Sequence, residues 1–175
     1  MRYPYAFLTI FDFIIQQETG GDPNGGYTND PDDPGGETKW GISKKTFPTL
    51  IIADTTKEEA QSIYYDIYWR NIDIDGIPDE IKMMLCDMGV NCGVETAKKY
   101  LQKAVGVEVD GVIGPKTIEA LNRYGFPCIV YLYGAWRRIY YLTIISKNTT
   151  LNKYTNGWFS RVTALEKLVN RLWHD

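Results

Sequence analysis

The spacing of apolar residues constrains the fold of this chain more than any other feature of its sequence. Apolar side chains recur three and four residues apart, which is the period of an α-helix with one buried face. The first such segment runs from Ala6 to Gln17 and is expected to end near Glu18, because Gly20 and Gly21 follow it. This pattern places the Glu18 carboxylate at the exit of a helix.

The same spacing predicts further helices along the rest of the chain. Their apolar positions span Ala60 to Tyr68, Ile81 to Met88, Ala97 to Ala104, Ile129 to Tyr140 and Phe159 to Leu172, and a shorter helix is expected over Thr117 to Tyr124. The segment Thr55 to Glu59 is a capping-box pattern, which is typical of a helix start. Gly106 is expected to end one helix, and Pro115 stands at a favourable first position of the next.

The segment after the first helix has the composition of a loop. Residues 19–37 are rich in Gly, Pro and Asp, which is typical of a long loop or an irregular β-hairpin. Loops of this length are usually functional. A short strand is predicted directly after it, over Thr38 to Ile42. Many helices with one small β element, and no alternation of strand and helix, predict an α+β fold that is predominantly α-helical.

Composition limits the partners that this chain can have. Its 175 residues are 44% hydrophobic, enough for one sizeable core or two small ones. A net charge of -3 gives no general attraction to nucleic acid or to an anionic membrane surface. Asp12 interrupts the apolar stretch from Ala6 to Ile15, so no cleavable signal is expected. No apolar run reaches the roughly 18 residues of a membrane span, so no membrane insertion is expected.

Few side chains remain that could carry out chemistry. The only histidine, His174, lies next to the C-terminus, which argues against Ser-His-Asp, Cys-His and His-based zinc sites. Cys86, Cys92 and Cys128 are odd in number and scattered, so they are interpreted as buried thiols rather than a disulfide framework or a metal cluster. Carboxylate chemistry remains, and it requires no cofactor.

One cluster of carboxylates stands out. It consists of Glu18, Asp22, Asp30, Asp32, Asp33 and Glu37. Cleavage of a glycosidic bond uses one protonated and one ionised carboxyl. Glu18, at the end of an apolar helix, is expected to be desolvated, which favours its protonated form, whereas carboxylates in a wet loop should stay ionised. The same residues would also fit a surface charge beside an ordinary turn. A calcium loop beginning at Asp22 fits poorly, because Tyr27 stands where an EF-hand requires glycine.

Longer motifs in the chain resemble a known family. They are Glu18, the segment 25–43 (GGYTNDPDDPGGETKWGIS), Tyr68-Trp69 and the segment 87–93 (DMGVNCG). Together they closely resemble the glycoside hydrolase family 108 muramidases, which are found in phage endolysins and bacterial lysozyme-like proteins. Three later segments, 101–106 (LQKAVG), 110–117 (DGVIGPKT) and 157–162 (GWFSRV), resemble the peptidoglycan-binding type 3 domain. The resemblance covers nearly the whole chain and implies a lysozyme-like fold, with a catalytic half over 1–92 and a binding half over 93–175, packed as one bilobal unit.

The resemblance also implies roles for individual residues. It makes Glu18 the general acid. By similarity to the layout of phage lysozymes, Asp33 would activate or orient water and Thr38 would hold that water, with Asp30 and Asp32 as competitors for the role of Asp33. The residues expected to contact glycan are Tyr27, Asp30, Trp40, Tyr68, Asp87 and Asn91, for which core packing is the alternative.

The chain departs from the family pattern at one place. The catalytic glutamate of the family stands directly before Gly-Gly-Tyr, whereas here the residues 19–24 intervene between Glu18 and Gly25. Either they are a loop insertion that leaves Glu18 at the helix exit, or another carboxylate enters the cleft. We favour the insertion, because no other glutamate lies upstream and a loop absorbs extra residues at little entropic cost.

The resemblance implies a muramidase that cleaves the β-1,4 bond between N-acetylmuramic acid and N-acetylglucosamine in peptidoglycan glycan strands. Inversion and retention of the anomeric centre both stay open. The alternatives are a non-catalytic peptidoglycan-binding or secretion-associated module, and hydrolysis of chitin-type polymers. A monomer is expected, made in the cytoplasm and acting on the cell wall after release by a phage holin, delivery in a phage particle or a bacterial export route.

Overall fold

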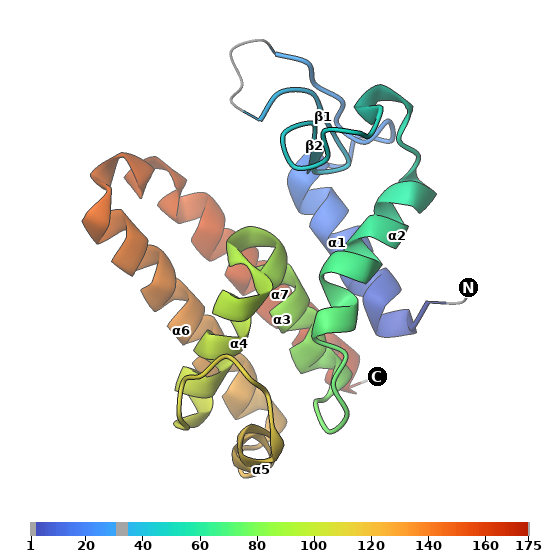
Figure 1. The fold of residues 1–175 in the computed structure, drawn as a ribbon. Helices are drawn as coiled ribbons and strands as arrows, with labels where there is room; N and C mark the ends of the chain where they lie inside the picture. The colour runs from blue at the N-terminus through green and yellow to red at the C-terminus, as the bar shows by residue number, and fades with distance from the viewer. Residues whose placement is uncertain (1–2, 31–34, 175) are drawn as a thin grey trace. The chain divides into compact units, whose positions relative to one another are not determined.

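The computed structural model describes residues 3–30 and 35–174 and is predominantly helical (Figure 1). The chain forms two compact units, Met1–Arg70 and Asn71–Asp175, here called the N-terminal unit and the C-terminal unit. The N-terminal unit contains α1 (Tyr5–Thr19), β1 (Thr38–Lys39), β2 (Ile42–Ser43), η1 (Ile52–Asp54) and α2 (Lys57–Ile67), with η2 (Trp69–Asn71) at its end. The C-terminal unit contains α3 (Asp79–Cys92), α4 (Val94–Val105), α5 (Pro115–Asn122), α6 (Phe126–Lys147), η3 (Thr149–Tyr154) and α7 (Thr155–His174). The α+β class predicted from the sequence is confirmed.

Helix α1 supplies much of the core of the N-terminal unit. Its buried residues are Ala6, Phe7, Ile10, Phe11, Ile14 and Ile15. Phe7 packs against the ring of Trp69 with centroids 5.7 Å apart, and Phe11 packs against Tyr64 at 5.5 Å. The helix ends at Thr19, where Gly20 takes a left-handed conformation with φ 64°. Both the helix and its glycine stop were predicted from the sequence.

The single strand predicted over Thr38 to Ile42 is instead a tight hairpin. Strands β1 and β2 pair antiparallel, with Lys39 opposite Ile42. Only Trp40 and Gly41 connect them, with φ values of 54° and 72°. Positive φ at both central residues is typical of two-residue hairpin turns, whose twist matches that of the strands. Tryptophan seldom adopts such a conformation, so the sequence pattern gave no sign of the turn.

Local signals place the start of α2 where the sequence predicted it. The Thr56 hydroxyl accepts a hydrogen bond from the backbone N–H of Glu59 at 3.1 Å, and Glu59 Oε2 accepts from the backbone N–H of Thr56 at 2.8 Å. These reciprocal bonds form a capping box, which satisfies two donors that a helix start leaves unpaired.

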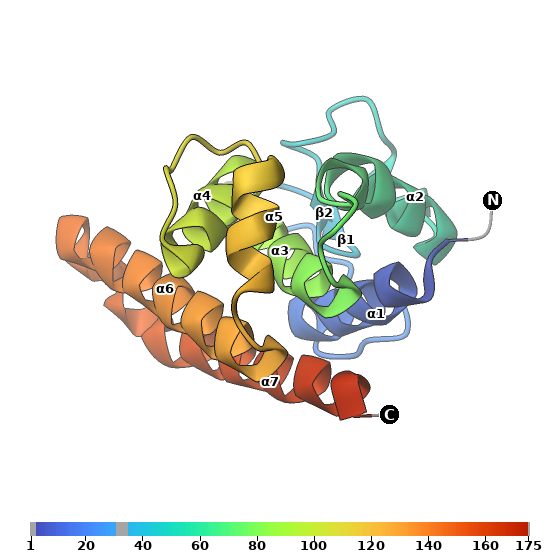
Figure 2. The ribbon, with the colours of Figure 1, turned by 90° about the horizontal axis from the view of Figure 1, so that it is seen from below.

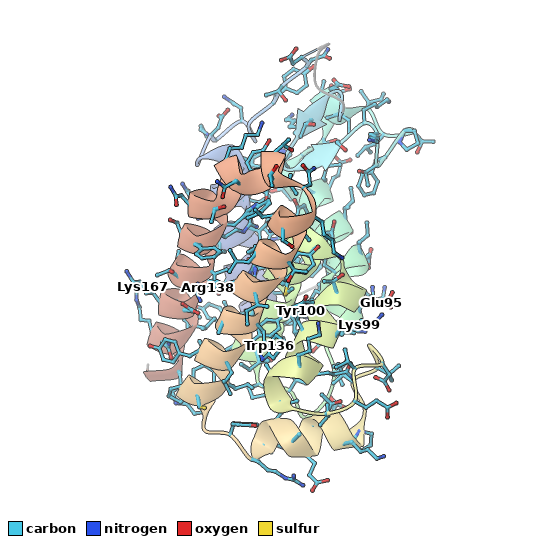
Figure 3. The ribbon with its side chains drawn as sticks, turned by 90° about the vertical axis from the view of Figure 1, so that its left-hand side faces the viewer. Glu95, Lys99, Tyr100, Trp136, Arg138 and Lys167 are labelled. Carbon is cyan, nitrogen blue, oxygen red and sulfur yellow. The ribbon has the colours of Figure 1, made fainter. Side chains whose placement is uncertain are left out.

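The C-terminal unit is a helical assembly in which α6 and α7 form a long antiparallel pair (Figures 1 and 2). Helix α3 packs against α4 and α7, and α4 packs against α6. Tyr100 of α4 and Trp136 of α6 lie next to each other with ring centroids 6.4 Å apart (Figure 3). Gly106 ends α4 in a left-handed conformation, and Pro115 begins α5, as predicted.

The compact units divide at a different position from the domains inferred from the sequence. The units separate after Arg70, because α3 packs against helices that lie later in the chain. The division into 1–92 and 93–175 rests on resemblance and stays a prediction. Across the described residues, no helix combines the length and the apolar character that a membrane span requires.

Candidate functional site

The carboxyl end of α1 lies against the hairpin turn within the N-terminal unit. Glu18 is the last residue but one of α1. A Cβ atom added to Gly41 would lie 3.3 Å from Cγ of Glu18 and would collide with the hydroxyl group of Tyr64. The absence of a side chain at Gly41 therefore allows the turn to approach both Glu18 and Tyr64. This is the contact that positions the predicted catalytic acid.

Tyr64 of α2 holds the turn in place. Its ring is buried, and its hydroxyl donates a hydrogen bond to the backbone carbonyl of Trp40 at 3.2 Å. Tyr68 lies one helical turn later, with its ring centroid 5.5 Å from that of Tyr64. Tyr64, Tyr68 and Gly41 all line a small pocket of about 50 Å³. Tyr68, a predicted glycan contact, is thus close to the turn that touches Glu18.

The Glu18 side chain is exposed, whereas the sequence led us to expect a desolvated carboxyl. The physical reason is its position: α1 ends one residue later, so no further turn of the helix covers it. The apolar helix therefore does not bury this carboxyl group.

An isolated β-bridge joins the loop to strand β1 of the hairpin. Thr28 and Thr38 exchange two backbone hydrogen bonds of 2.9 Å, and the Thr38 hydroxyl donates to the carbonyl of Gly36 at 3.1 Å. The Tyr27 hydroxyl donates to Oε1 of Glu37 at 2.9 Å. This hydrogen bond, followed by burial and the Glu37 charge, raises the pKa of Tyr27. The Thr38 hydroxyl proton is therefore engaged within the loop.

Trp40 does not fit its predicted role as a glycan contact. Its side chain is 7% exposed, and its indole N–H donates to the carbonyl of Thr55 at 3.0 Å. The ring also covers Gly25, where a Cβ atom would overlap it. Trp40 is a core residue that anchors the hairpin to the segment before α2, and this packing accounts for its unusual backbone conformation.

The intervening residues 19–24 form a compact turn at the end of α1. The backbone N–H of Asp22 donates to the carbonyl of Thr19 at 3.2 Å, and Asp22 Oδ1 accepts from the backbone N–H of Asn24 at 2.8 Å. Residues of this turn, together with Trp40 and Lys57, line a pocket of about 270 Å³. Glu18 remains within α1 despite the extra residues.

Asp87, another predicted glycan contact, is fully buried in the C-terminal unit. Its Oδ2 accepts from Arg137 at 2.6 Å and its Oδ1 from Arg161 at 2.7 Å. Burial opposes ionisation, but the two guanidinium groups outweigh it and lower the pKa of Asp87. A carboxylate with no exposed surface and two cationic partners cannot contact a glycan, so we remove Asp87 from the candidate site.

Sequence reasoning missed both arginine partners of Asp87. One signal was present: Arg137 lies four residues from both Tyr133 and Tyr141, on the apolar face of α6. A charge in such a stripe indicates a buried ion pair. Asn91 also belongs to this unit; it is exposed, and its side-chain amide donates to the backbone carbonyl of Asp87 at 3.2 Å.

Three further candidate positions precede the hairpin in the sequence. Asp30 is exposed. Asp33, the predicted second catalytic group, and its competitor Asp32 lie outside the described residues. Within residues 3–30 and 35–174, no three His, Cys, Asp or Glu side chains group closely enough to hold a metal ion.

An N-terminal helix with a glutamate in its last turn, a small hairpin beside that turn and further helices define an α+β fold of the lysozyme-like class. The solved structure of SagA from Brucella abortus is similar to this chain, with a TM-score of 0.78 and 28% sequence identity over 97% of this chain and 96% of that one. No curated protein sequence matches the chain.

Family models divide the chain between two known families. Residues 11–93 match Glycosyl hydrolase 108, and residues 96–163 match the Predicted Peptidoglycan domain. The chain is therefore similar to the glycosyl hydrolase 108 family over its first half and to the peptidoglycan domain after it. These matches support a glycoside hydrolase that acts on peptidoglycan.

Proposed function

We propose that the chain is a muramidase that hydrolyses the β-1,4 bond between N-acetylmuramic acid and N-acetylglucosamine, with Glu18 as its general acid. The observation that carries this proposal is the contact of Glu18 with the Gly41 turn. That contact holds the carboxyl beside a small hairpin, at a point where a bound sugar chain could reach it. The match of residues 11–93 to Glycosyl hydrolase 108 supports a glycosidic bond as the target.

The proposed reaction uses two carboxyl groups. Glu18 donates its proton to the leaving oxygen while a second carboxylate activates water or stabilises the oxocarbenium-like centre. Asp33 is our candidate for the second group, with Asp30 and Asp32 as competitors, and Thr38 holds the attacking water. Because Glu18 is exposed in the free chain, the bound glycan itself would have to exclude water from it, which favours the protonated form.

The remaining glycan contacts belong to exposed or half-buried side chains. Tyr27 and Tyr68 have accessible ring surface in the N-terminal unit, and Asn91 is accessible in the C-terminal unit. Aromatic rings with a polar edge suit the mixed surface of a sugar. We expect a monomer, because the enzyme works on a large wall polymer. It would reach the wall after release by a phage holin, in a phage particle or by bacterial export.

Replacement of Glu18 by glutamine tests the proposal directly. Purified wild type should release soluble fragments from peptidoglycan sacculi, and Glu18→Gln should lower the rate by about 100-fold or more, as expected for loss of a general acid. Glu58→Gln is the matched control, since Glu58 is an exposed glutamate of α2 in the same unit. Equal rates for wild type and Glu18→Gln would dismiss Glu18 as the acid.

Mass spectrometry of the fragments tests the bond. Reducing ends of N-acetylmuramic acid are expected, whereas reducing ends of N-acetylglucosamine would contradict the muramidase assignment. The anomeric configuration of the first product, read by proton NMR, distinguishes inversion from retention. Binding to sacculi without any release would favour the second candidate, a non-catalytic binding module, for which the exposure of Glu18 is the motivating observation.

A further inference from the structure

A pocket of about 630 Å³ lies in the C-terminal unit, at the loop between α4 and α5. Its size is within the roughly 300–1,000 Å³ of small-ligand sites. Polar side chains in its lining include those of Glu108, Asp110, Lys116 and Thr117. Figure 2 shows the loop as the segment that joins α4 to α5.

Gln102 of α4 holds the loop in one conformation. Its side chain is only 1% exposed. Its Oε1 accepts from the backbone N–H of Gly111 at 2.7 Å, and its Nε2 donates to Asp110 Oδ1 at 2.6 Å and to the carbonyl of Val112 at 3.0 Å. Asp110 Oδ1 also accepts from the backbone N–H of Val112 at 2.8 Å. The pocket wall is therefore organised before any ligand binds.

The first turn of α5 supplies groups that favour an anion. The helix begins at Pro115 without a side-chain cap, so the backbone N–H groups of Lys116 and Thr117 have no acceptor within the helix. Thr117 is 3% exposed, and its hydroxyl has no hydrogen-bond partner in the part of the chain that the structure describes. The hydroxyl oxygen is not itself fully buried, so it can pair with water or with a ligand in the pocket. With the Lys116 ammonium, these donors suit a carboxylate.

The loop supplies groups of opposite charge. Asp110 and Glu108 are both exposed carboxylates in the lining. The hydrogen bond from Gln102, followed by that from the Val112 N–H, lowers the pKa of Asp110, so its charge persists at neutral pH. Carboxylates at this position favour a ligand ammonium group.

We propose that this pocket binds a short peptide that carries both a free carboxylate and a free side-chain amine, as the stem peptides of peptidoglycan do. The carboxylate pairs with Lys116, the Thr117 hydroxyl and the first turn of α5. The amine pairs with Glu108 and Asp110. This inference rests on the proposed function, because that function makes peptidoglycan the polymer, and it gives the C-terminal unit a peptide specificity separate from cleavage of the glycan.

Calorimetric titration of the full chain with a synthetic peptide tests the pocket. The probe is N-acetyl-Ala-Glu-Lys-Ala, compared with its C-terminal amide and with a form acetylated on the lysine amine. We expect each modification to weaken binding about tenfold, as the loss of one charge-assisted hydrogen bond would. Equal affinities for all three peptides, or no binding, would overturn the proposal.

Variants of single pocket residues test which side chains bind the carboxylate and which bind the amine of the peptide. Lys116→Gln should reduce the preference for the acid over the amide, and Glu108→Gln should reduce the preference for the free amine over its acetylated form. Lys147→Gln, an exposed lysine outside the pocket, should behave as wild type. Loss of discrimination at the wrong end, or in the Lys147 variant, would contradict the assignment.

Thr117→Val separates binding from folding. Because the hydroxyl has no hydrogen-bond partner among residues 3–30 and 35–174, its replacement by a methyl group should leave the melting temperature unchanged or raise it, while peptide affinity falls several-fold. Unchanged peptide affinity would remove Thr117 from the site. Competition by chitotriose for the same pocket would show a glycan site and overturn the peptide assignment.

The two proposals fail in different ways. Peptide binding without hydrolysis by wild type would contradict the muramidase alone. Hydrolysis that depends on Glu18, without peptide binding, would contradict the pocket alone.

Discussion

Gly41 is the residue on which the geometry beside Glu18 depends most. Its φ of 72° is a conformation that residues with a side chain adopt at a cost, and its hydrogen atom faces the Tyr64 hydroxyl where no carbon would fit. Glycine at position 41 therefore allows both the backbone conformation of the hairpin turn and the close approach of Glu18 to that turn.

We predict that Gly41→Ala destabilises the chain by about 1–3 kcal/mol, because the left-handed conformation becomes strained and the turn must move away from Tyr64. Release of sacculus fragments should fall as well, since the turn touches Glu18. Gly157→Ala is the control: Gly157 lies in α7 with open space around it, and alanine should leave stability unchanged or slightly higher. Equal urea midpoints for the two variants would show that the turn tolerates a side chain.

At the scale of elements, Asp87 joins three helices of the C-terminal unit. It belongs to α3, and its partners Arg137 and Arg161 belong to α6 and α7. The Arg137 Nε also donates to the hydroxyl of Tyr141 at 2.9 Å, while its Nη2 is buried without a partner in the described part of the chain. Removal of the carboxylate would leave two guanidinium groups buried without their counter-ion.

Asp87→Asn is therefore expected to cost about 3–5 kcal/mol at neutral pH, the range for breaking a buried ion pair. Asp66→Asn is the control, because the Asp66–Arg70 pair is exposed and should contribute less than about 1 kcal/mol. Urea unfolding followed by circular dichroism measures both. A loss below 1 kcal/mol for Asp87→Asn would contradict a structural role for these pairs.

The same ion pairs determine a pH dependence. The pKa of Asp87 is lowered in the folded state, so its contribution is fully present above the unfolded pKa of about 3.9 and is lost as the pH falls through the lowered folded value. The stability difference between wild type and Asp87→Asn should therefore shrink in acid. A difference that stays constant down to pH 2 would contradict this linkage.

At the scale of the whole molecule, family boundaries and compact units do not coincide. The hydrolase family match ends at residue 93, at the end of α3, whereas α3 packs against α4 and α7 in the C-terminal unit. The last helix of the segment that matches the hydrolase family, α3, is therefore packed against residues that match the peptidoglycan domain.

A fragment of residues 1–93 should consequently fail to fold stably on its own. It would lose the helices that pack on α3 and leave Asp87 without Arg137 and Arg161. We expect the fragment to aggregate and to show no cooperative thermal transition, whereas the full chain should unfold cooperatively. A soluble fragment with a sharp transition would show that the hydrolase region is an independent domain.

Much of the fold could be predicted from the sequence, because its signals are local. The capping box at Thr56, the glycine stops at Gly20 and Gly106 and the proline start at Pro115 all depend on neighbours within a few residues. The Trp40–Gly41 turn could not be predicted, because the unusual backbone of Trp40 is stabilised by burial of its ring against Gly25 and Thr55.

The candidate site, too, could be predicted from the sequence only in part. Placement of Glu18 at the exit of α1 followed from the helix pattern and its glycine stop, and the family resemblance supplied its role. Its exposure did not follow, since that depends on what the rest of the fold places over the end of a helix. Asp33 remains a prediction, because it lies outside the described residues.

The sequence by itself determined where helices begin and end, the lysozyme-like class and the carboxylate at the end of the first helix, since these follow from apolar spacing, capping residues and motif resemblance. Only the tertiary structure decided that Trp40 is core and that Asp87 is a buried partner of two arginines. Those arginines lie 50 and 74 residues away along the chain. Contacts over such separations leave no local pattern in a sequence, because they arise only when the folded helices bring the side chains together.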